Sequence, residues 1–272
     1  MISLPPVSVV MNAYNKEEYI GQTIESILGQ TFGDFEFIIV NDGSTDNTSE
    51  VIAKYKDSRI RVFHHENRGI RATLNRGFGE AGGKYIAHID ADDVATPNRL
   101  QVQFDFMEKH PDHVLIGCWC KVLNENNDIV ELWCPPMDDM GIRWAQLFDN
   151  VLGHSGFFIR REIMDGEEWY KTPYAEEYDL AVRLSQKGKL ACIPEVLVIY
   201  RDLVEGGITD TKWSQQKGFS EKISMAQLAD MMKEDVVTPE QRYAVWKLIY
   251  RPWLIEEPQT SLAVETLKKI AV

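Results

Sequence analysis

The chain has 272 residues, of which 44% are hydrophobic, so it can bury a sizeable core and is not a disordered protein. Its formal net charge of −13 argues against a nucleic-acid partner, because phosphate backbones require a basic surface, and against simple electrostatic docking on anionic lipid. No apolar run could span a bilayer and the first residues lack the features of a signal peptide, so we expect a cytoplasmic protein whose four cysteines are reduced.

The first third of the chain alternates short apolar runs with segments of helical periodicity. We expect strands at 7–11, 35–40, 60–63 and 84–90, with helices at 15–30, 46–56 and 69–81. Asn15 and Glu18 have the spacing of a capping box, which predicts that the first helix opens at Asn15. Strands that alternate with helices over short loops form a parallel sheet with helices on both faces, so the predicted fold class is α/β.

The turn after the first strand reads Asn12-Ala13-Tyr14-Asn15. A dinucleotide-binding fold requires G-x-G-x-x-G at this turn, and an ATP hydrolase requires a P-loop, which the chain also lacks. The turn offers an aromatic ring and amides in place of a glycine-rich phosphate cradle. NAD-dependent and ATP-hydrolysing functions are therefore excluded.

The remainder of the chain has a mixed pattern. We expect a helix at 97–109, a hairpin of strands at 114–122 and 128–133, a helix at 138–148, a strand at 157–160 and a helix at 174–187. A pair of strands interrupted by Pro194 is expected at 190–200. Residues from 211 on have a helical pattern, and their Trp213, Trp246, Trp253 and Met225–Met232 could pack on the core, form a dimer or contact a membrane, core packing being favoured.

The strand at 84–90 runs into three acids, Asp90, Asp92 and Asp93. Carboxylates this close repel one another, and a divalent cation removes the repulsion; hard oxygen ligands suit Mg²⁺ or Mn²⁺. Ligands of open α/β sheets bind beyond the carboxyl ends of the strands, where this cluster falls. A solvated acidic turn is the alternative interpretation.

Several motifs between residues 7 and 208 resemble, in their order, those of the large inverting family 2 of nucleotide-sugar glycosyltransferases. They are Val7–Asn15, Gln30–Phe32, Val40–Asp46, Asn67–Gly69, Leu74–Gly77, Asp90–Asp93 and Glu176–Leu180. The resemblance implies the GT-A fold, a Rossmann-like, mostly parallel central sheet flanked by helices, in residues 1–210. Residues 1–95 would form the nucleotide-binding half and 96–210 the acceptor-binding half, followed by a C-terminal helical extension at 211–272.

The resemblance also implies which residues bind the nucleotide. Tyr14 would stack on the base, with Asn12 and the backbone around Ala13 beside it; a hydrophobic lid on the first helix is the alternative role of Tyr14. Asp42 would accept a hydrogen bond from the imide N–H of uracil or thymine; an Asx turn or helix cap is its alternative role. Arg71 would reach the base or a phosphate, or else remain a solvated helix residue.

The acids at the end of the fourth strand receive roles from the same resemblance. Asp90, with Ala91 beside it, would hold the ribose, and Asp92 would bind a Mg²⁺ or Mn²⁺ ion that bridges the two phosphates. Asp93 would support this site or cap the next helix.

The catalytic base of the family is the second member of a Glu-Asp pair, which in this chain is Glu176–Glu177. Glu177 would take the proton of an acceptor hydroxyl that attacks the anomeric carbon from the opposite face, and the configuration would invert. This is a departure, because the side chain of Glu177 is one methylene longer than that of the family's aspartate. The alternative is that Glu176, Glu177 and Asp179 only complement a helix N-terminus. The resemblance also places His154 and Asp179 on the acceptor side; a structural role is the alternative for the lone histidine His154.

A second departure lies at the end of the domain. Many relatives carry a Tyr-Arg-x-His element whose histidine helps to hold the metal or the diphosphate, whereas residues 200–209 contain no histidine. Asp202 or Glu205 could replace it.

The predicted function is metal-assisted, inverting transfer of a sugar, most simply from a UDP-linked donor, to a glycan or lipid-linked glycan in surface polysaccharide biosynthesis, with peripheral membrane contact possible. One alternative is a sugar nucleotidyltransferase, which would need a glycine-rich, basic loop after the first strand that residues 12–17 do not provide. The other is a catalytically silent nucleotide-sugar binding module, which the two departures favour.

Overall fold

The structure is a computed structural model that describes residues 5–202, 208–231, 238, 240–241, 243–245 and 257–270. The strands are β1 Val7–Ala13, β2 Phe35–Asn41, β3 Ile60–His64, β4 Tyr85–Asp90, β5 Val94–Ala95, β6 His113–Leu123, β7 Ile129–Trp133, β8 Phe158–Arg160 and β9 Lys189–Arg201. The helices are α1 Ile20–Leu28, α2 Thr48–Ala53, α3 Ile70–Glu80, α4 Arg99–Lys109, α5 Asp139–Gln146, α6 Glu176–Ser185, α7 Ile208–Met231 and α9 Glu257–Ile270, with short 3-10 turns at His154–Gly156 and Arg161–Met164.

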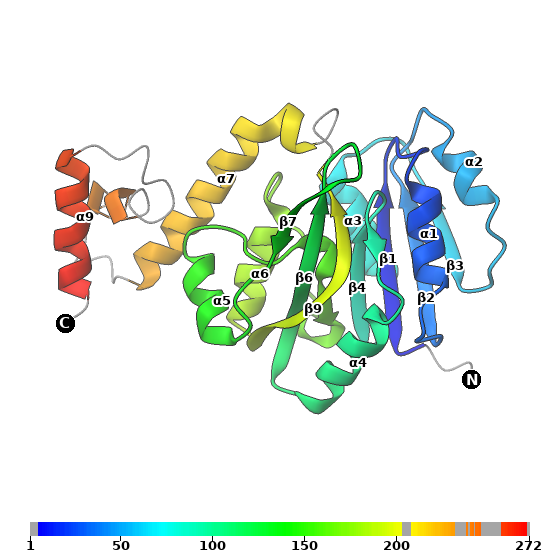
Figure 1. The fold of residues 1–272 in the computed structure, drawn as a ribbon, viewed down its shortest axis with the longest axis horizontal. Helices are drawn as coiled ribbons and strands as arrows, with labels where there is room; N and C mark the ends of the chain where they lie inside the picture. The colour runs from blue at the N-terminus through cyan, green and yellow to red at the C-terminus, as the bar shows by residue number, and fades with distance from the viewer. Residues whose placement is uncertain are drawn as a thin grey trace.

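The described strands form one sheet in the order β3-β2-β1-β4-β8-β6-β9-β5, with β7 paired to β6 (Figure 1). The pairs β1·β2, β1·β4 and β2·β3 are parallel, and every antiparallel pair includes a strand later than β4. The predicted alternation of strands and helices in the first third of the chain is therefore confirmed. Beyond it the sheet becomes mixed.

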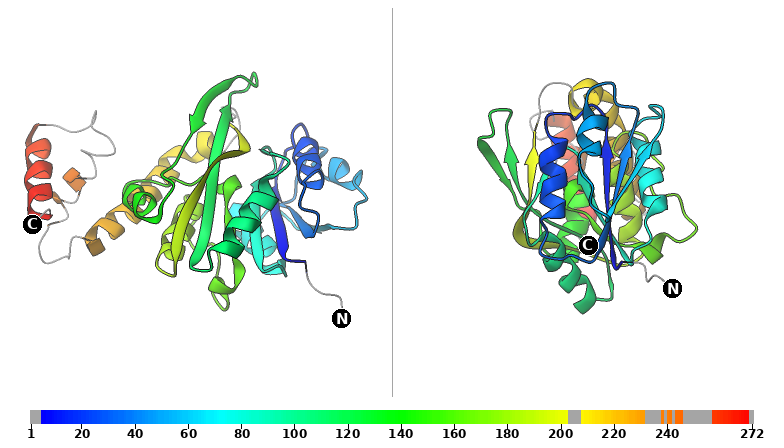
Figure 2. Two further views of the ribbon diagram at one scale, coloured as in Figure 1. Left: turned by 60° about the horizontal axis from the view of Figure 1, so that its bottom comes forward. Right: turned by 90° about the vertical axis from the view of Figure 1, so that its right-hand side faces the viewer.

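Helices cover both faces of this sheet (Figure 2). On one face Ile24 of α1 and Leu100 of α4 belong to a fully buried apolar cluster. On the other face a second buried cluster contains Leu74 of α3, Ile142 of α5 and Leu180 of α6. The two clusters hold the sheet between helical layers, which fixes the strand ends that carry the polar residues.

The first helix begins at Ile20, so the predicted capping box at Asn15 is wrong. Asn15 lies in the left-handed region, with φ of 50°, and its Oδ1 accepts a hydrogen bond from the N–H of Thr45 at 2.8 Å. The Asn15 side chain thus ties the loop after β1 to the loop after β2 and is not available to cap a helix.

Residues 189–201 form one strand, β9, so the predicted pair of strands is also wrong. The parallel ladder with β6 pairs Ile193 with Cys118 and then Val196 with Trp119. Pro194 lies in the bulge between these pairs, where its missing N–H interrupts no ladder bond.

The helical extension begins with α7 at Ile208, near the expected boundary at 211, and leads away from the sheet (Figure 1). Gln227 donates from Nε2 to the Gln146 carbonyl at 2.8 Å, and Phe148 shares a small apolar cluster with Leu228. The predictions for Trp246, Trp253, Met232, Glu205 and the Trp213 side chain lie outside the described residues. None of the helices that the structure describes is long and apolar enough to cross a membrane.

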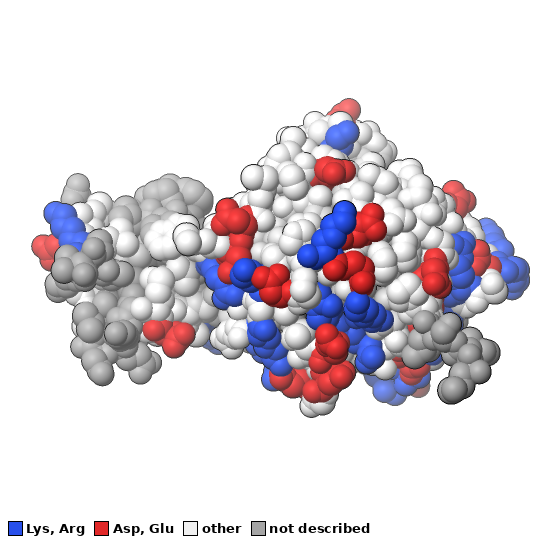
Figure 3. Space-filling model, turned by 90° about the horizontal axis from the view of Figure 1, so that it is seen from below, with Lys and Arg blue, Asp and Glu red and all other residues white. Residues whose placement is uncertain are grey.

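Acidic and basic side chains lie close together in small groups on the face shown in Figure 3. Such neighbours pair at the starts of two strands, Lys84 with Glu108 at 2.6 Å and Lys189 with Asp112 at 2.8 Å. At these two places the acidic side chain therefore has a basic partner on the surface. Cys118, Cys120 and Cys192 are buried, Cys134 is exposed, and all four are free thiols, as predicted.

Candidate active site

Three parallel strands end at one edge of the sheet and bring the predicted nucleotide residues together. In the register of β1, Ala13 lies opposite Asn41 of β2, and Asn12 lies opposite Asp90 of β4. Asp42 follows directly, and its N–H donates to the Ala13 carbonyl at 2.9 Å. The carboxyl edge of β1, β2 and β4 is thus a single polar surface, as expected for a ligand site of an open α/β sheet.

Tyr14 is 45% exposed, directly after the buried Ala13. It is therefore not a lid buried on the first helix, and its ring is free to stack on a flat base. The tie between Asn15 and Thr45 fixes the loop that carries it.

Asp42 is buried, and its carboxylate fastens the start of α3. Oδ1 accepts from the N–H of Arg68 at 2.7 Å and Oδ2 from the N–H of Gly69 at 3.0 Å, and His65 Nδ1 lies 3.2 Å from Oδ1. The Asx interaction in the loop after β2 belongs instead to Asn41, whose Oδ1 accepts from the Ser44 N–H at 3.0 Å. A base N–H would be an additional donor on the Asp42 carboxylate.

Arg71, on the first turn of α3, is exposed and points across to a later segment. Its Nη1 donates to the carbonyl of Lys171 at 3.0 Å. The guanidinium therefore stabilises the segment that precedes α6.

Asp90 is held by Ser155. The Ser155 hydroxyl donates to Asp90 Oδ2 at 3.0 Å and accepts from the Asp90 N–H at 3.0 Å. The neighbouring Ala91 is buried, and its carbonyl accepts from the hydroxyl of Thr23 at 2.9 Å. These contacts fix the direction in which the Asp90 carboxylate leaves the strand.

Two basic residues, Lys16 and Arg201, contact Asp92 and Asp93. Lys16 Nζ lies 2.5 Å from Asp92 Oδ2, and the Arg201 N–H donates to Asp93 Oδ1 at 2.9 Å. The Arg201 guanidinium also donates to the Asp92 carbonyl. Burial and the charge of Asp90 raise the pKa of Asp92, and burial with the charges of Asp92 and Asp90 raises that of Asp93 well above its usual value.

The acid cluster fits a hard divalent cation. Asp93 is 0% exposed, so the alternative of a solvated acidic turn is wrong, and its Oδ2 has no hydrogen-bond partner among the described residues. Burial and the repulsion between neighbouring carboxylates raise the pKa values of Asp92 and Asp93, and a bound divalent cation would offset this repulsion. One ligand atom each from His88, Asp90 and His154 also lies within 4.8 Å of the others, but both nitrogens of His88 already have partners. Asp92, with Asp90 beside it, is the better candidate to hold the ion.

Glu176 and Glu177 open α6 after Tyr174 and Ala175, which have φ of 55° and 68°. Burial raises the pKa of Glu176 to about 8 and that of Glu177 to about 7, and the negative charge of Asp90 adds to both shifts. Acids that only complement a helix N-terminus would be ionised and solvated. Glu176 is instead buried, and the charge of Asp90 acts on both carboxyls, which favours a carboxyl pair near the end of β4.

His154 and Asp179, which the sequence places on the acceptor side, have well-defined partners. The ring of His154 stacks on His88 with centroids 3.7 Å apart, and its Nε2 lies 2.8 Å from the hydroxyl of Tyr170. Asp179 accepts from Arg183 Nε at 2.9 Å. His154 therefore lies beside Asp90, and Asp179 is part of an ion pair on α6.

Four further residues contact the predicted site residues although their sequence assigned them no role: Lys16, Asn150, Ser155 and Arg201. The Nδ2 of Asn150 donates a hydrogen bond to Oε1 of Glu177 at 3.5 Å. Each of the four reaches its acid over a long sequence separation, and only Arg201 lies in a motif, the Tyr-Arg start of the element at residues 200–209. His88 had a signal, because it is a polar residue inside an otherwise apolar strand.

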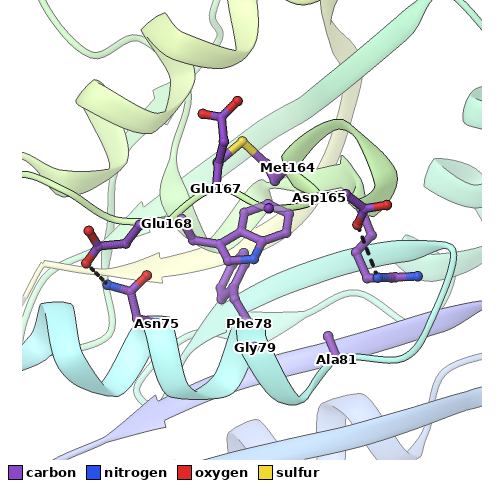
Figure 4. A pocket seen from close by; sticks show the side chains of 11 residues that line it. Asn75, Phe78, Gly79, Ala81, Met164, Asp165, Glu167 and Glu168 are labelled. Atoms are coloured by element: carbon purple, nitrogen blue, oxygen red, sulfur yellow. Dashed lines mark hydrogen bonds and ion pairs between the residues drawn. The ribbon is translucent and has the colours of Figure 1, made fainter.

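A pocket of about 370 Å³ lies between α3 and the segment at 161–169 (Figure 4). Its lining includes the indole of Trp169, and its polar side chains pair with one another, Asn75 with Glu168 at 3.2 Å and Arg161 with Asp165 at 3.5 Å. The pocket does not include the acid cluster or Tyr14, so it is separate from the edge of the sheet described above.

Residues 8–166 match the family model for glycosyl transferase family 2. An uncharacterized glycosyltransferase of Haemophilus influenzae is 32% identical over 237 residues, which cover 82% of this chain and 72% of that protein. An uncharacterized glycosyltransferase of Methanocaldococcus jannaschii is 36% identical over 205 residues, 72% of this chain and 71% of that protein.

Two solved structures are similar to the whole chain. S. aureus TarS, in complex with UDP-GlcNAc, has a TM-score of 0.66 at 15% identity, covering 97% of this chain and 80% of that one. A mannosyltransferase of Pyrobaculum calidifontis, in complex with GDP-Man and Mn²⁺, has a TM-score of 0.65 at 18% identity, covering 99% of this chain and 76% of that one.

Proposed function

The chain belongs to glycosyl transferase family 2, and we propose that it transfers a sugar from a UDP-linked donor to an acceptor hydroxyl with inversion of configuration. It has the GT-A fold that the sequence predicts. The observation that carries the proposal is a carboxyl pair at the start of α6, in which Glu176 is buried and burial, with the nearby charge of Asp90, raises the pKa of Glu177 to about 7. A general base is most effective when its pKa is near the working pH.

The donor would bind along the carboxyl edge of β1, β2 and β4. The exposed ring of Tyr14 supports a stacking role, and the buried carboxylate of Asp42 supports selection of a base with an N–H, as in uracil. Asp90, held by Ser155, would bind the ribose, with Asn12, Ala13 and Ala91 shaping the floor. Arg71 remains a candidate for the phosphates, although its guanidinium contacts Lys171 here.

The acid cluster would hold a Mg²⁺ or Mn²⁺ ion through Asp92, supported by Asp93. When bound, the ion supplies positive charge that stabilises the departing nucleoside diphosphate. Lys16 pairs with the same carboxylate and would bind a phosphate of the donor when Asp92 holds a cation. Arg201 holds the loop in place through the Asp92 carbonyl and Asp93.

Glu177 would act as the catalytic base. Its carboxylate takes the proton of the acceptor hydroxyl while the hydroxyl oxygen bonds to the anomeric carbon, and the bond from that carbon to the phosphate oxygen breaks with its electron pair leaving on the diphosphate. Attack opposite to the leaving group inverts the configuration. Burial keeps the pKa values of both Glu176 and Glu177 in the neutral range, and the charge of Glu177 adds to the shift of Glu176.

The acceptor would be a glycan or a lipid-linked glycan, used in surface polysaccharide biosynthesis. Support comes from α5 and the turn before it, where Met137, Met140 and Trp144 are more than half exposed. This apolar strip precedes Asn150, the neighbour of Glu177, so an amphiphilic acceptor could lie along it. The strip also supports peripheral contact with a membrane.

A catalytically silent nucleotide-sugar binding module is the second candidate. It is favoured by the longer side chain of Glu177 and by the absence of histidine from residues 200–209. Asp202 is exposed, with its N–H on the Leu123 carbonyl at 2.8 Å, and Glu205 lies outside the described residues.

Calorimetric titration separates these candidates. UDP, GDP and dTDP are titrated with Mn²⁺ and then with EDTA, on the wild type, on Asp92→Ala and on the surface control Asp105→Ala. We expect metal-dependent binding of UDP that only Asp92→Ala abolishes. A screen of UDP-sugars and acceptors follows, with Glu177→Gln as the inactive control. Binding without turnover would identify a silent module, and no binding of any nucleotide would refute the proposed function.

A further inference from the structure

A fully buried histidine lies in the middle of β4. His88 is 0% exposed, whereas its neighbours Ile86, Ala87 and Ile89 are apolar. Its ring is stacked on His154 at 3.7 Å between centroids. A buried imidazole needs a partner for each of its nitrogens, because an unpaired polar group in the core is costly.

The nitrogen Nδ1 of His88 lies 3.3 Å from the backbone carbonyl of His154. A carbonyl can only accept a hydrogen bond, so Nδ1 must carry the proton. Burial, reinforced by the positive charge of Arg99, lowers the pKa of His88 to about 3, so the ring is neutral. A neutral imidazole has a single N–H, and Nε2 therefore offers a lone pair.

That lone pair faces the side chain of Asn12. In the structure Oδ1 of the Asn12 carboxamide lies 2.8 Å from Nε2, an arrangement that sets two acceptors against each other when the ring carries its proton on Nδ1. The oxygen and nitrogen of a carboxamide have nearly the same shape, and their positions follow from their hydrogen-bond partners. Only the NH₂ group can donate to Nε2, so the carbonyl oxygen of Asn12 must point away from His88.

We infer that His88 is a positioning residue that orients the Asn12 carboxamide so that its oxygen faces the donor site. Asn12 lies opposite Asp90 across the β1·β4 pair, so this oxygen and the Asp90 carboxylate form neighbouring acceptors. They fit a hydrogen-bond donor of the nucleoside, a hydroxyl or an imide N–H. The orientation of Asn12 follows from the contacts of His88 alone, whereas the ligand that it meets rests on the proposed function.

Nitrogen-15 NMR of the histidine rings tests the orientation directly. We expect His88 to show a protonated Nδ1 and an unprotonated Nε2, without titration between about pH 5 and about pH 8. In Asn12→Asp an oxygen faces Nε2 whichever way the carboxylate turns, so Nε2 should gain a proton. Asn126→Asp, in the hairpin turn, should leave the His88 signals unchanged. A protonated Nε2 in the wild type would overturn the inference, and so would an unchanged spectrum of Asn12→Asp.

A double-mutant cycle tests the role in binding. His88→Phe keeps a ring to stack on His154 but leaves the Asn12 carboxamide unoriented, so UDP affinity should fall about 2–10-fold, the worth of one hydrogen bond. Asn12→Ala should cost a similar factor, and the double variant no more than either single variant. Additive losses, or full affinity in His88→Phe, would refute the positioning role. If the wild type binds no nucleotide, the proposed function fails, and the NMR experiment still decides the orientation of Asn12.

Discussion

Replacing Glu177 with glutamine should abolish activity and at the same time stabilise the protein at alkaline pH. The carboxyl has a pKa of about 7 in the folded protein against an ordinary value of 4.5. Folding thus favours the protonated form. The stability that this proton contributes is fully present below about pH 4.5 and is lost as the pH rises through about 7.

The magnitude follows from the same difference. About 2.5 pKa units at about 1.4 kcal/mol each correspond to a ceiling of about 3.5 kcal/mol. Water reaches part of the half-buried Glu177 side chain, and Glu176 shares the titration with it. We therefore expect the free energy of unfolding of Glu177→Gln to be about 1–3 kcal/mol higher than that of the wild type at about pH 8. The two proteins should have equal stability near pH 4.5. Urea unfolding at both pH values measures this difference, with Glu125→Gln in the hairpin turn as control.

Transfer activity provides the second readout. In the wild type it should rise as the pH increases through about 7, because the base must be deprotonated. Glu177→Gln should lose a factor of about 10²–10⁴ in kcat, the usual worth of a general base, and Glu177→Asp, which restores the residue of the family motif, should retain most of it. If Glu177→Gln were fully active, or less stable than the wild type at about pH 8, the assignment of the base would be wrong.

Three further predictions concern the donor site and its scaffold. Lys16→Met should bind Mn²⁺ about fivefold more tightly than the wild type in a metal titration without nucleotide. The Lys16 ammonium lies 2.5 Å from Asp92 Oδ2 and competes with the ion for this carboxylate, and its removal should strengthen metal binding by about 1 kcal/mol. Tyr14→Ala should weaken UDP binding by about 1–3 kcal/mol, or about 5–150-fold, in calorimetry, because the base loses its stacking surface. Gly77→Ala should lower the free energy of unfolding by about 1–3 kcal/mol, because a Cβ would lie 2.6 Å from Cγ1 of Val10 under α3.

Each of these substitutions has a matched control. Lys56→Met removes an exposed lysine and should leave Mn²⁺ affinity unchanged, and Tyr14→Phe keeps the ring and should bind UDP as the wild type does. Gly79→Ala, two residues further along α3, meets nothing within 4 Å and should be neutral or stabilising by up to about 1 kcal/mol. Each prediction would be contradicted by one result. These results are weaker Mn²⁺ binding in Lys16→Met, an unchanged UDP affinity in Tyr14→Ala, and equal stability of the two alanine variants on α3.

Much of the scaffold could be predicted because it depends on local patterns. The apolar run at 35–40 and the helical periodicity at 69–81 need only their own sequence to indicate β2 and α3. Asn15 shows where this approach fails. Its capping spacing is real, but the side chain is used by Thr45, 30 residues away, and no pattern around residue 15 contains that information.

The residues of the candidate site also fall into two groups, those that a local sequence pattern predicts and those that it does not. Asp90 and Asp92 were identifiable because a strand of apolar residues runs directly into them. Their partners were not, because Lys16 and Arg201 reach the acids from 76 and 109 residues away. Which carboxylate is paired, and which is left to bind a ligand, therefore depends on the tertiary structure.

The contact between Arg201 and the acid loop has a consequence for the folding pathway. Val94 and Ala95 of β5 pair with Ile199 and Val198 of β9, and Arg201 then closes on Asp93. Contacts between residues so distant in sequence form slowly, because the intervening chain must first become ordered. Strands β1 to β4 can associate while the chain is still being synthesised, but the acid loop gains its final shape only after residue 201 has emerged and β9 has docked. Donor affinity would then appear late in refolding, after most of the secondary structure, so the protein would bind a donor only once β6 to β9 have also folded.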